Sequence, residues 1–355
     1  DVEKGVFRKN KRIRTILKFD NILEVQSRNI NRLKKNNFLD FLAIESNQMP
    51  DNNYEMKIIF AGTPEVAATA LARISKSHEV LFAITRPDAQ VGRNRVLTPS
   101  PVAQQAEELG IPVVKGNKLD ASLVEQITNS GAEKAVVIAF GAMIPESALN
   151  AIEWWNIHYS LLPMWRGASP LQHSLKTNSG SGITIFKLDR GMDTGPIITQ
   201  QQIEFEPEET SGEALERFTI IASDMVSELL NRPQVAVAQA GPTTHAGKLT
   251  RSDAKIDWND RAEEIHRMVR AMNPEPTAWT QSNGKDIKVI RTRVSKEATA
   301  GNRQAGDVFR GPEGVVLVQC GGGTELALIE LQPAGKSKML GPDWLNGQNK
   351  EVHFG

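Results

Sequence analysis

The stretch Met56-Lys57-Ile58-Ile59-Phe60-Ala61-Gly62-Thr63-Pro64 decides the fold that the sequence predicts. Its first five residues form a short apolar run, which is typical of a buried strand, and the last three predict a tight turn. An Ala-rich segment follows and continues to Ser75, so the turn leads directly into a helix. A strand, a turn and a helix in this order form the unit from which α/β sheets are built.

Further apolar runs repeat this unit. Strands are predicted at 80–84, 112–114 and 135–139, with helices near 102–109 and 123–130. Because strands and helices alternate, the economical fold class is α/β, with a Rossmann-like, doubly wound and mostly parallel sheet. A nicotinamide-binding domain would carry Gly-x-Gly-x-x-Gly after its first strand, and the turn at 62–64 does not supply it. The sequence therefore disfavours a nucleotide-dependent oxidoreductase.

Size and composition limit the remaining classes. With 355 residues the chain is long enough for two domains, and its formal net charge of +0 requires any nucleic-acid surface to be local. The single Cys320 excludes an intrachain disulfide, which fits a cytoplasmic protein of bacterial type, with an organelle as the alternative. The six histidines do not cluster at metal-ligand spacing, so no metal is expected. No apolar run approaches the roughly 20 residues of a membrane span, so no membrane partner is expected.

Residues 1–48 differ in composition from the rest, because Asn, Lys, Ile and Leu recur there. A transit peptide would be poor in acids, whereas Asp20 and Glu24 interrupt this segment. We expect a poorly ordered extension, or a start assigned too far upstream of Met49 or Met56. A nucleic-acid-binding arm is the alternative, since basic residues are present.

The chemistry is expected in the segment 154–198, where Asn156 and His158 stand two residues apart. On an extended segment this spacing points both side chains to one face, so a carboxamide and an imidazole would share a pocket. The carboxamide can donate to an oxygen that gains negative charge, and the imidazole can donate or move a proton. Asp193 lies in a glycine-flanked turn, and near His158 its carboxylate would fix the imidazole tautomer and raise the His158 pKa. The set suits acyl transfer.

These three residues also have a purely structural interpretation. Asn-x-His can end a strand, and an Asp before Thr-Gly commonly forms a turn. Because short patterns of this kind recur by chance, their spacing alone favours the structural interpretation.

A longer pattern in the same segment favours the catalytic interpretation. It runs through Asn156-Ile157-His158-Tyr159-Ser160-Leu161-Leu162-Pro163, Trp165-Arg166-Gly167-Ala168-Ser169-Pro170 and Met192-Asp193-Thr194-Gly195. This pattern resembles the folate-dependent formyltransferases, and within them the branch that acts on methionyl-tRNA. The resemblance implies transfer of the formyl group of 10-formyltetrahydrofolate to the α-amino group of initiator methionyl-tRNA, for translation initiation. It implies Asn156, His158 and Asp193 as catalytic residues.

By the same resemblance, two loops would hold the pterin of the folate. One loop contributes Phe140, Gly141, Ile144 and Pro145, and the other contributes Ser160, Leu161, Leu162 and Pro163. Ligands bind at the carboxyl ends of parallel strands, so the segment after 135–139 and the segment at Asn156 are expected to converge on one crevice. For Ile144 and Pro145 an ordinary role in the core and a turn is the alternative.

A long polar loop at 86–101 follows the second predicted strand. A loop of this length inside a compact domain is usually functional or disordered. In tRNA formyltransferases the similar loop enters the acceptor stem, so the resemblance implies phosphate or groove contacts from Arg93 and Arg95. The sequence departs from the family pattern here, with Ala89-Gln90-Val91 where Arg-Pro-Ala is common. A solvated charged loop is the alternative for each arginine.

Domain boundaries follow from composition. After a strand at 196–203, the capping pattern Thr210-Ser211-Gly212-Glu213 opens an amphipathic helix that ends at Leu230. Residues 231–247 are rich in Pro, Gly and Gln and lack apolar periodicity, which predicts a linker. The expected domains are therefore a catalytic domain at 49–230 and a second domain at 248–355.

The second domain is predicted as a smaller, OB-like β-barrel. A helix at 262–272 is followed by short strands bounded by Gly or Pro, at 287–291, 306–309, 314–318 and 324–331. Motifs such as Lys248-Leu249-Thr250 resemble the C-terminal domain of the tRNA-specific branch. Basic residues around the barrel are expected to follow a tRNA backbone, although each alone also fits a solvated surface: Lys248, Arg251, Arg270, Lys336 and Lys338.

Other functions stay open at this point. The nearest is an enzyme of the same class that formylates an amino sugar nucleotide or hydrolyses formyltetrahydrofolate, and another is an RNA-binding module with a decayed site. The basic loop and the C-terminal motifs favour the tRNA-specific reaction. The expected partners are therefore folate and initiator methionyl-tRNA, and a monomer is expected.

Overall fold

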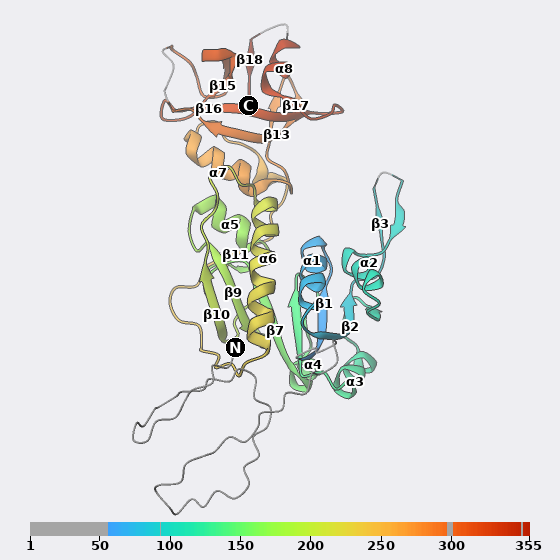
Figure 1. Ribbon diagram of the computed structural model, residues 1–355. Coiled ribbons are helices and arrows are strands. Elements are labelled where there is room, and N and C mark those ends of the chain that lie inside the picture. Colours follow the sequence, from blue (N-terminus) through green and yellow to red (C-terminus); the bar gives the residue numbers. More distant parts are fainter. Residues whose placement is uncertain (1–55, 93, 297–300, 349–350) are drawn as a thin grey trace, which may run out of the picture. The chain divides into compact units, whose positions relative to one another are not determined.

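The computed structural model describes residues 56–92, 94–296, 301–348 and 351–355 (Figure 1). The predicted extension at 1–48 and Arg93 lie outside these described residues. Within them the chain builds two seven-stranded sheets and two short two-stranded sheets. Buried apolar residues form three clusters, two against the first large sheet and one in the second. No described helix is long and apolar enough to cross a membrane.

The first sheet has the strand order β10-β9-β7-β6-β1-β2-β5. Its parallel strands are β1 (Lys57–Gly62), β2 (Glu79–Thr85), β5 (Val113–Lys115), β6 (Lys134–Ile138) and β7 (Glu153–His158). Beyond β7 lie two antiparallel strands, β9 (Gly182–Lys187) and β10 (Ile197–Gln202). The prediction of a mostly parallel, doubly wound sheet is confirmed, because the chain builds outward from β1 on both sides.

Helices cover both faces of this sheet. One core joins the sheet to α1 (Glu65–Ile74), α2 (Pro101–Glu108) and α6 (Ser211–Leu230), and the other includes residues of α3 (Ala121–Asn129) and α4 (Glu146–Ala151). Buried residues recur at every fourth position of α6: Ala214, Phe218, Ala222, Val226 and Leu230. This spacing gives α6 a continuous apolar stripe, which packs against the sheet and α1.

The predicted loop at 86–101 contains a β-hairpin. Its strands are β3 (Ala89–Val91) and β4 (Val96–Thr98), which pair in antiparallel register. Figure 1 shows this hairpin, in cyan, extending beyond α2. Its apolar side chains face solvent, with exposed fractions of 56% for Val91, 60% for Val96 and 67% for Leu97. An isolated hairpin without a buried face is marginally stable, so the segment depends on the two ends that anchor it in the sheet domain.

The second large sheet is antiparallel, with the order β12-β13-β16-β15-β14-β18 and with β17 paired to β16. The backbone N–H of Gly355 donates to the carbonyl of Gln281 at 3.2 Å, which brings the end of the last strand to the first and nearly closes a barrel. The predicted small barrel is thereby confirmed. Its strands are β12 (Trp279–Ser282), β13 (Lys285–Val294), β14 (Asp307–Arg310), β15 (Val316–Gln319), β16 (Glu325–Pro333), β17 (Met339–Leu340) and β18 (Val352–His353).

The barrel is accompanied by helices. The helix α7 (Ala262–Met272) has the predicted bounds, and α8 (Gly341–Asn346) follows β17. Two 3₁₀ turns lie at Ser252–Ala254 and Pro312–Gly314. In the core, the ring of Phe354 stacks on Trp258 and on Trp344, at centroid distances of 5.3 and 5.5 Å.

Arg270 at the end of α7 contacts the segment that leads into α6. Its Nε donates to the carbonyl of Glu209 at 2.7 Å, and its Nη2 donates to the carbonyl of Glu206 at 2.6 Å. Both acceptors directly precede α6. Two of the donor nitrogens of Arg270 are thus engaged by backbone carbonyls, and its expected contact with a tRNA backbone stays a prediction.

The start of α6 generates a stability prediction. Thr210 and Glu213 form the predicted capping box, in which Thr210 Oγ1 accepts from the N–H of Glu213 and Glu213 Oε2 accepts from the N–H of Thr210. Thr210→Ala should lower the free energy of unfolding by about 1 kcal/mol. Calorimetry should show a thermal midpoint lower by roughly 2–4 °C.

A matched control is Thr128→Ala in α3, since Thr128 is exposed and its hydroxyl bonds only to the Val124 carbonyl within the same helix. Equal midpoints for Thr210→Ala and the unaltered chain would show that the cap contributes nothing.

Candidate active site

Asn156 and His158 lie on β7 and point to the same face of the sheet. The intervening Ile157 and the preceding Trp155 belong to the core on the opposite face, as the two-residue period of a strand requires. His158 is 4% exposed, whereas Asn156 is half-buried. Within the described part of the chain, no side-chain hydrogen bond involves the Asn156 carboxamide. Its two N–H donors are therefore available to a ligand.

One backbone carbonyl fixes the tautomer of His158. Nε2 of His158 lies 2.9 Å from the carbonyl oxygen of Trp165. A carbonyl oxygen can only accept, so Nε2 carries the proton, and Nδ1 of the neutral imidazole has a free lone pair. Trp165 presents this carbonyl from a left-handed backbone conformation, with φ 62°.

Asp193 stands opposite Nδ1 of His158. The distance from Asp193 Oδ2 to His158 Nδ1 is 3.8 Å, which is too long for a hydrogen bond. Oδ2 instead accepts from the backbone N–H of Gly167 at 2.8 Å. The structure thus brings the predicted residues together, but the expectation that Asp193 fixes the tautomer is wrong, because the Trp165 carbonyl does so.

The pKa of His158 also differs from the expectation. Burial lowers it, because desolvation disfavours the charged imidazolium, while the Asp193 charge and the Trp165 carbonyl act in the opposite direction without prevailing. The expected rise is therefore wrong. His158 is neutral at pH 7, and the free lone pair on Nδ1 can accept a proton beside a carboxylate.

The turn that carries Asp193 is closely fitted. Asp193 itself has φ 53°, and at Gly195 a Cβ atom would stand 1.8 Å from the carbonyl oxygen of Lys187. Only glycine permits that approach. Asp189 Oδ1 accepts from Thr194 Oγ1 at 2.6 Å and from the Gly191 N–H at 3.0 Å. These bonds hold the turn in one conformation.

The first predicted folate loop lies at the carboxyl ends of β1, β2 and β6. Thr63 Oγ1 donates to the Phe140 carbonyl at 3.1 Å, and Arg86 Nη1 donates to the Gly141 carbonyl at 3.0 Å. A hollow of about 520 Å³ opens here, and Thr63, Arg86, Phe140 and Gly141 are among its lining residues. It lies at the point where the strand order reverses, which is where α/β sheets bind ligands.

Ile144 and Pro145 lie outside this hollow. Ile144 is half-buried and packs against the core that contains α3 and α4 residues, and Pro145 precedes the first residue of α4. These positions match their alternative interpretation as core and turn residues.

The second predicted folate loop, 160–163, is held by its own polar contacts. Ser160 is fully buried, and its hydroxyl donates to the Met164 carbonyl at 2.7 Å. Thr184 Oγ1 donates to the Ser160 carbonyl and accepts from the Leu162 N–H, at 2.6 and 3.1 Å. Gln200 Nε2 donates to the Leu162 carbonyl at 2.8 Å. Leu162 and Pro163 are also buried, so of this loop Leu161 offers the most exposed surface.

Sequence reasoning missed several residues that shape this region, namely Thr63, Arg86, Thr184, Gln200 and Gln239. Thr184 and Gln200 lie on the antiparallel strands β9 and β10, and they bond to a loop that is distant in sequence. The only hint in the sequence was that these side chains are polar. Their polar character does not predict which loop they bond to.

The predicted tRNA contacts lie in exposed segments. Arg95 is exposed in the turn of the β3–β4 hairpin, with φ 50°, and Lys248 is exposed where the second domain begins. Arg93 is outside the described residues.

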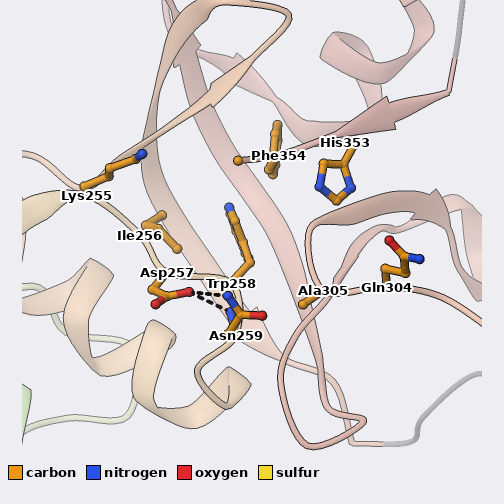
Figure 2. A pocket seen from close by; sticks show the side chains of 10 residues that line it. Lys255, Ile256, Asp257, Trp258, Asn259, Gln304, Ala305, His353 and Phe354 are labelled. Atoms are coloured by element: carbon orange, nitrogen blue, oxygen red, sulfur yellow. Dashed lines mark hydrogen bonds between the residues drawn. The ribbon is translucent and has the colours of Figure 1, made fainter.

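The barrel domain carries a hollow of its own, with a volume of about 570 Å³ (Figure 2). Aromatic rings of Trp258 and Phe354 lie beside polar and charged side chains, including Lys255 and His353. Asp257 Oδ1 accepts from the backbone N–H and from Nδ2 of Asn259, at 3.0 and 2.8 Å. Among residues that the structure describes, no three His, Cys, Asp or Glu side chains gather to hold a metal ion.

Comparison with known families defines the class of protein. A family model described as "Formyl transferase" matches residues 56–230, and one described as "Formyl transferase, C-terminal domain" matches residues 248–349. A third model, described as a protein of unknown function, matches residues 1–72. The α/β sheet and the barrel are therefore the two domains of a formyl transferase.

Curated relatives narrow the class. The protein named "Methionyl-tRNA formyltransferase" from Arthrobacter sp. (strain FB24) is 38% identical over 301 residues, which cover 82% of this chain and 97% of the relative. The one from Clavibacter sepedonicus is 38% identical over 300 residues, with the same coverage of 82% and 97%. The chain belongs to the methionyl-tRNA formyltransferase family.

Two solved structures share the fold. The N-formyltransferase from Helicobacter canadensis, in complex with folinic acid and dTDP-3-aminofucose, has a TM-score of 0.58 at 18% identity, over 78% of this chain and 99% of that one. The sugar 3N-formyl transferase WlaRD, with dTDP and 5-N-formyl-THF, has a TM-score of 0.56 at 19% identity, over 80% and 99%. At these identities the likeness concerns the fold.

The buried neutral His158 generates a prediction about stability and pH. The unfolded chain has an ordinary imidazole with a pKa of about 6.5, so below that pH it binds more protons than the folded chain. The free energy of unfolding therefore falls as the pH drops from about 6.5 towards the lower folded pKa. When the pH is lowered from about 7.5 to about 5.5, the thermal midpoint should therefore fall less in His158→Gln than in the unaltered chain.

His266 acts as an internal reference for this measurement. Burial lowers the pKa of His266 too. Because His266 is present in both proteins, its effect on the free energy of unfolding is the same in both. An equal acid-induced fall of the thermal midpoint in both proteins would contradict the assigned environment of His158.

Proposed function

We propose that this chain transfers the formyl group of 10-formyltetrahydrofolate to the α-amino group of methionine on initiator tRNA, as a monomer in the cytoplasm. The observation that carries the proposal is the unpartnered Asn156 carboxamide on the same strand as His158, whose free Nδ1 faces the Asp193 carboxylate. Membership of the methionyl-tRNA formyltransferase family supports the substrate assignment.

Asn156 is assigned to the oxyanion. An α-amine has a pKa of about 7.7–8.0, so roughly a tenth to a sixth of it is unprotonated and nucleophilic at pH 7. Attack on the formyl carbon gives a tetrahedral intermediate with a negative oxygen, and the two N–H groups of Asn156 can stabilise it. His158 cannot share this role while neutral, because its single N–H is bound to the Trp165 carbonyl.

His158 and Asp193 are assigned to the proton. The attacking amine must lose a proton, and the folate nitrogen that leaves must gain one. Nδ1 of His158 accepts the first proton, and the Asp193 carboxylate 3.8 Å away stabilises the imidazolium that forms. The same proton then passes to the leaving nitrogen when the carbon–nitrogen bond of the donor breaks. The products are tetrahydrofolate and the formylated amine.

We assign folate binding to the two predicted loops, 140–145 and 160–163. The hollow at Phe140 and Gly141 supports this assignment, since it lies where α/β sheets bind ligands, and the half-buried Leu161 offers apolar surface. Ile144 and Pro145 would act there by shaping the loop.

Binding of tRNA is assigned to the β3–β4 hairpin, with Arg93 and Arg95, and to the domain at 248–355, with Lys248. The exposed position of Arg95 and Lys248 supports phosphate contacts. The hollow of Figure 2 does not add a stacking surface for a base, because the rings of Trp258 and Phe354 are buried and packed on one another. Residues 49–230 would then supply the chemistry.

The deciding experiment is formyl transfer from 10-formyltetrahydrofolate to charged initiator methionyl-tRNA, beside charged elongator methionyl-tRNA and a free amino sugar nucleotide. Transfer to the initiator alone is the expected result. Transfer to the amino sugar nucleotide would overturn the substrate assignment, and folate consumption without a formylated product would indicate a hydrolase.

The assignment of Asn156 predicts a large kinetic effect. Asn156→Ala should lower kcat roughly a hundredfold or more, because the oxyanion loses its donors. Asn150→Ala is the matched control, since Asn150 is exposed on α4 and should keep full activity. Near-normal turnover by Asn156→Ala would remove Asn156 from the mechanism.

The assignment of Arg95 predicts a salt effect. Arg95→Gln should weaken tRNA binding similarly for all tRNA sequences and reduce the slope of log affinity against log salt concentration by about one. Filter binding over a series of salt concentrations measures this slope. Lys76→Gln is the control, because Lys76 is exposed after α1, away from the hairpin. An unchanged slope for Arg95→Gln would exclude a phosphate contact.

A further inference from the structure

The segment between α6 and the barrel, predicted as a linker, is bonded to the active-site loops. Val237 and Ile197 exchange two backbone hydrogen bonds of 2.7 and 2.8 Å. Thr244 Oγ1 accepts from the N–H of Trp165 at 2.8 Å. The strand β11 (His245–Ala246) pairs in parallel with β8 (Arg166–Gly167). The segment therefore passes along the two loops that hold His158 and Asp193.

Gln239 makes the densest set of these contacts. Its Nε2 donates to the carbonyls of Asp193 at 2.9 Å and Gly195 at 2.8 Å. Its Oε1 accepts from Arg166, at 3.1 Å from Nε and at 2.6 Å from Nη2. A carboxamide has two N–H donors and two acceptor lone pairs, so all four bonds of this half-buried side chain are made.

These contacts join the two sides of the proposed proton site. Trp165 and Gly167, which flank Arg166, bind His158 Nε2 and Asp193 Oδ2 respectively. Gln239 binds Arg166 through Oε1 and the backbone carbonyl of Asp193 through Nε2. The separation between His158 Nδ1 and the Asp193 carboxylate thus depends on the relative position of two loops, and Gln239 connects those loops.

We propose that Gln239 is a positioning residue, which holds the Asp193 turn against Arg166 and so sets the distance between the Asp193 carboxylate and His158. Gln239 bonds to neither the imidazole of His158 nor the carboxylate of Asp193. Its role rests on the function proposed above for these two side chains. The charged and titratable groups around the unit include Asp193 and Asp189 on the turn, Arg166 on β8 and His158 on β7. His173 is a further one, since its ring stacks on Trp165 at a centroid distance of 5.5 Å.

The chemistry of the amide explains why glutamine is suited to this position. A glutamate would place carboxylate oxygens against two carbonyl oxygens, which also only accept. A methionine has a similar length but neither donors nor a strong acceptor, so Gln239→Met removes all four bonds while it fills much of the same space. Arg166 then keeps its charge but loses the acceptor that ties it to the turn.

The experiment follows the His158 imidazole by NMR in the whole chain labelled at histidine, with His158→Gln to assign its signal. Asp193→Asn should lower the titration midpoint of His158, because the neighbouring negative charge is removed. Gln239→Met should shift the midpoint in the same direction by a smaller amount, since the carboxylate spends less time near Nδ1. Gln239→Met should also reduce kcat roughly tenfold to a hundredfold, as misplacement of catalytic groups does.

Gln234→Met is the matched control. Gln234 lies five positions earlier, and its Nε2 donates to two backbone carbonyls, those of Leu229 and Arg232, at 3.0 and 3.1 Å, away from the active-site loops. This variant should leave both the His158 titration and kcat unchanged. If Gln239→Met does not fold, Gln239→Ala serves as the second variant in the same two measurements.

The proposal is overturned if the His158 titration in the Gln239 variant matches that of the unaltered chain, or if Gln234→Met shifts it equally. The titration does not depend on turnover. A chain without formyl transfer but with the predicted shift would therefore refute the proposed function and leave the positioning role intact.

Discussion

The hydrogen bond from His158 Nε2 to the Trp165 carbonyl is the contact on which the rest of the site depends. It fixes the proton on one nitrogen and leaves the other free, opposite Asp193. A buried imidazole with this tautomer can accept a proton but cannot donate to an oxyanion while neutral. In the proposed mechanism this separates the roles of the polar side chains: the carboxamide stabilises the oxyanion, and the imidazole carries the proton. A backbone carbonyl achieves this separation.

The surrounding structure holds that carbonyl in place. Trp165 lies in a left-handed conformation, its N–H is bound by Thr244, and β8 follows it directly. The partner of β8 is a two-residue strand that belongs to the connection between the domains. The connection is therefore a structural part of the candidate active site, and the same chain segment leads to the barrel. One stretch of backbone thus links the two domains and binds the loops of the candidate site.

Much of the fold followed from local patterns. The apolar runs predicted β1, β2, β5 and β6. The helix α7 has the predicted bounds because its buried residues recur at helical spacing and Asn273-Pro274 follows it. The hairpin at 89–98 was predicted as a loop, since its strands are short and their apolar residues are exposed. The strand β9 was not predicted. The pairing of Asn156 and His158 was predicted because it depends only on the two-residue period of a strand.

The sequence by itself determined the alternation of strands and helices, the shared face of Asn156 and His158, and the family, because each rests on short-range spacing or ordered motifs. Only the tertiary structure decided the tautomer and the lowered pKa of His158, the anchoring of Asp193 by Gly167, and the position of Arg270 between domains. Gln239 bonds to residues 46 and 73 positions away, and composition identified its segment only as a linker. Contacts of this kind form only when segments that are distant in the sequence come together in the fold. The burial that lowers the pKa of His158 likewise depends on the packing of the whole core.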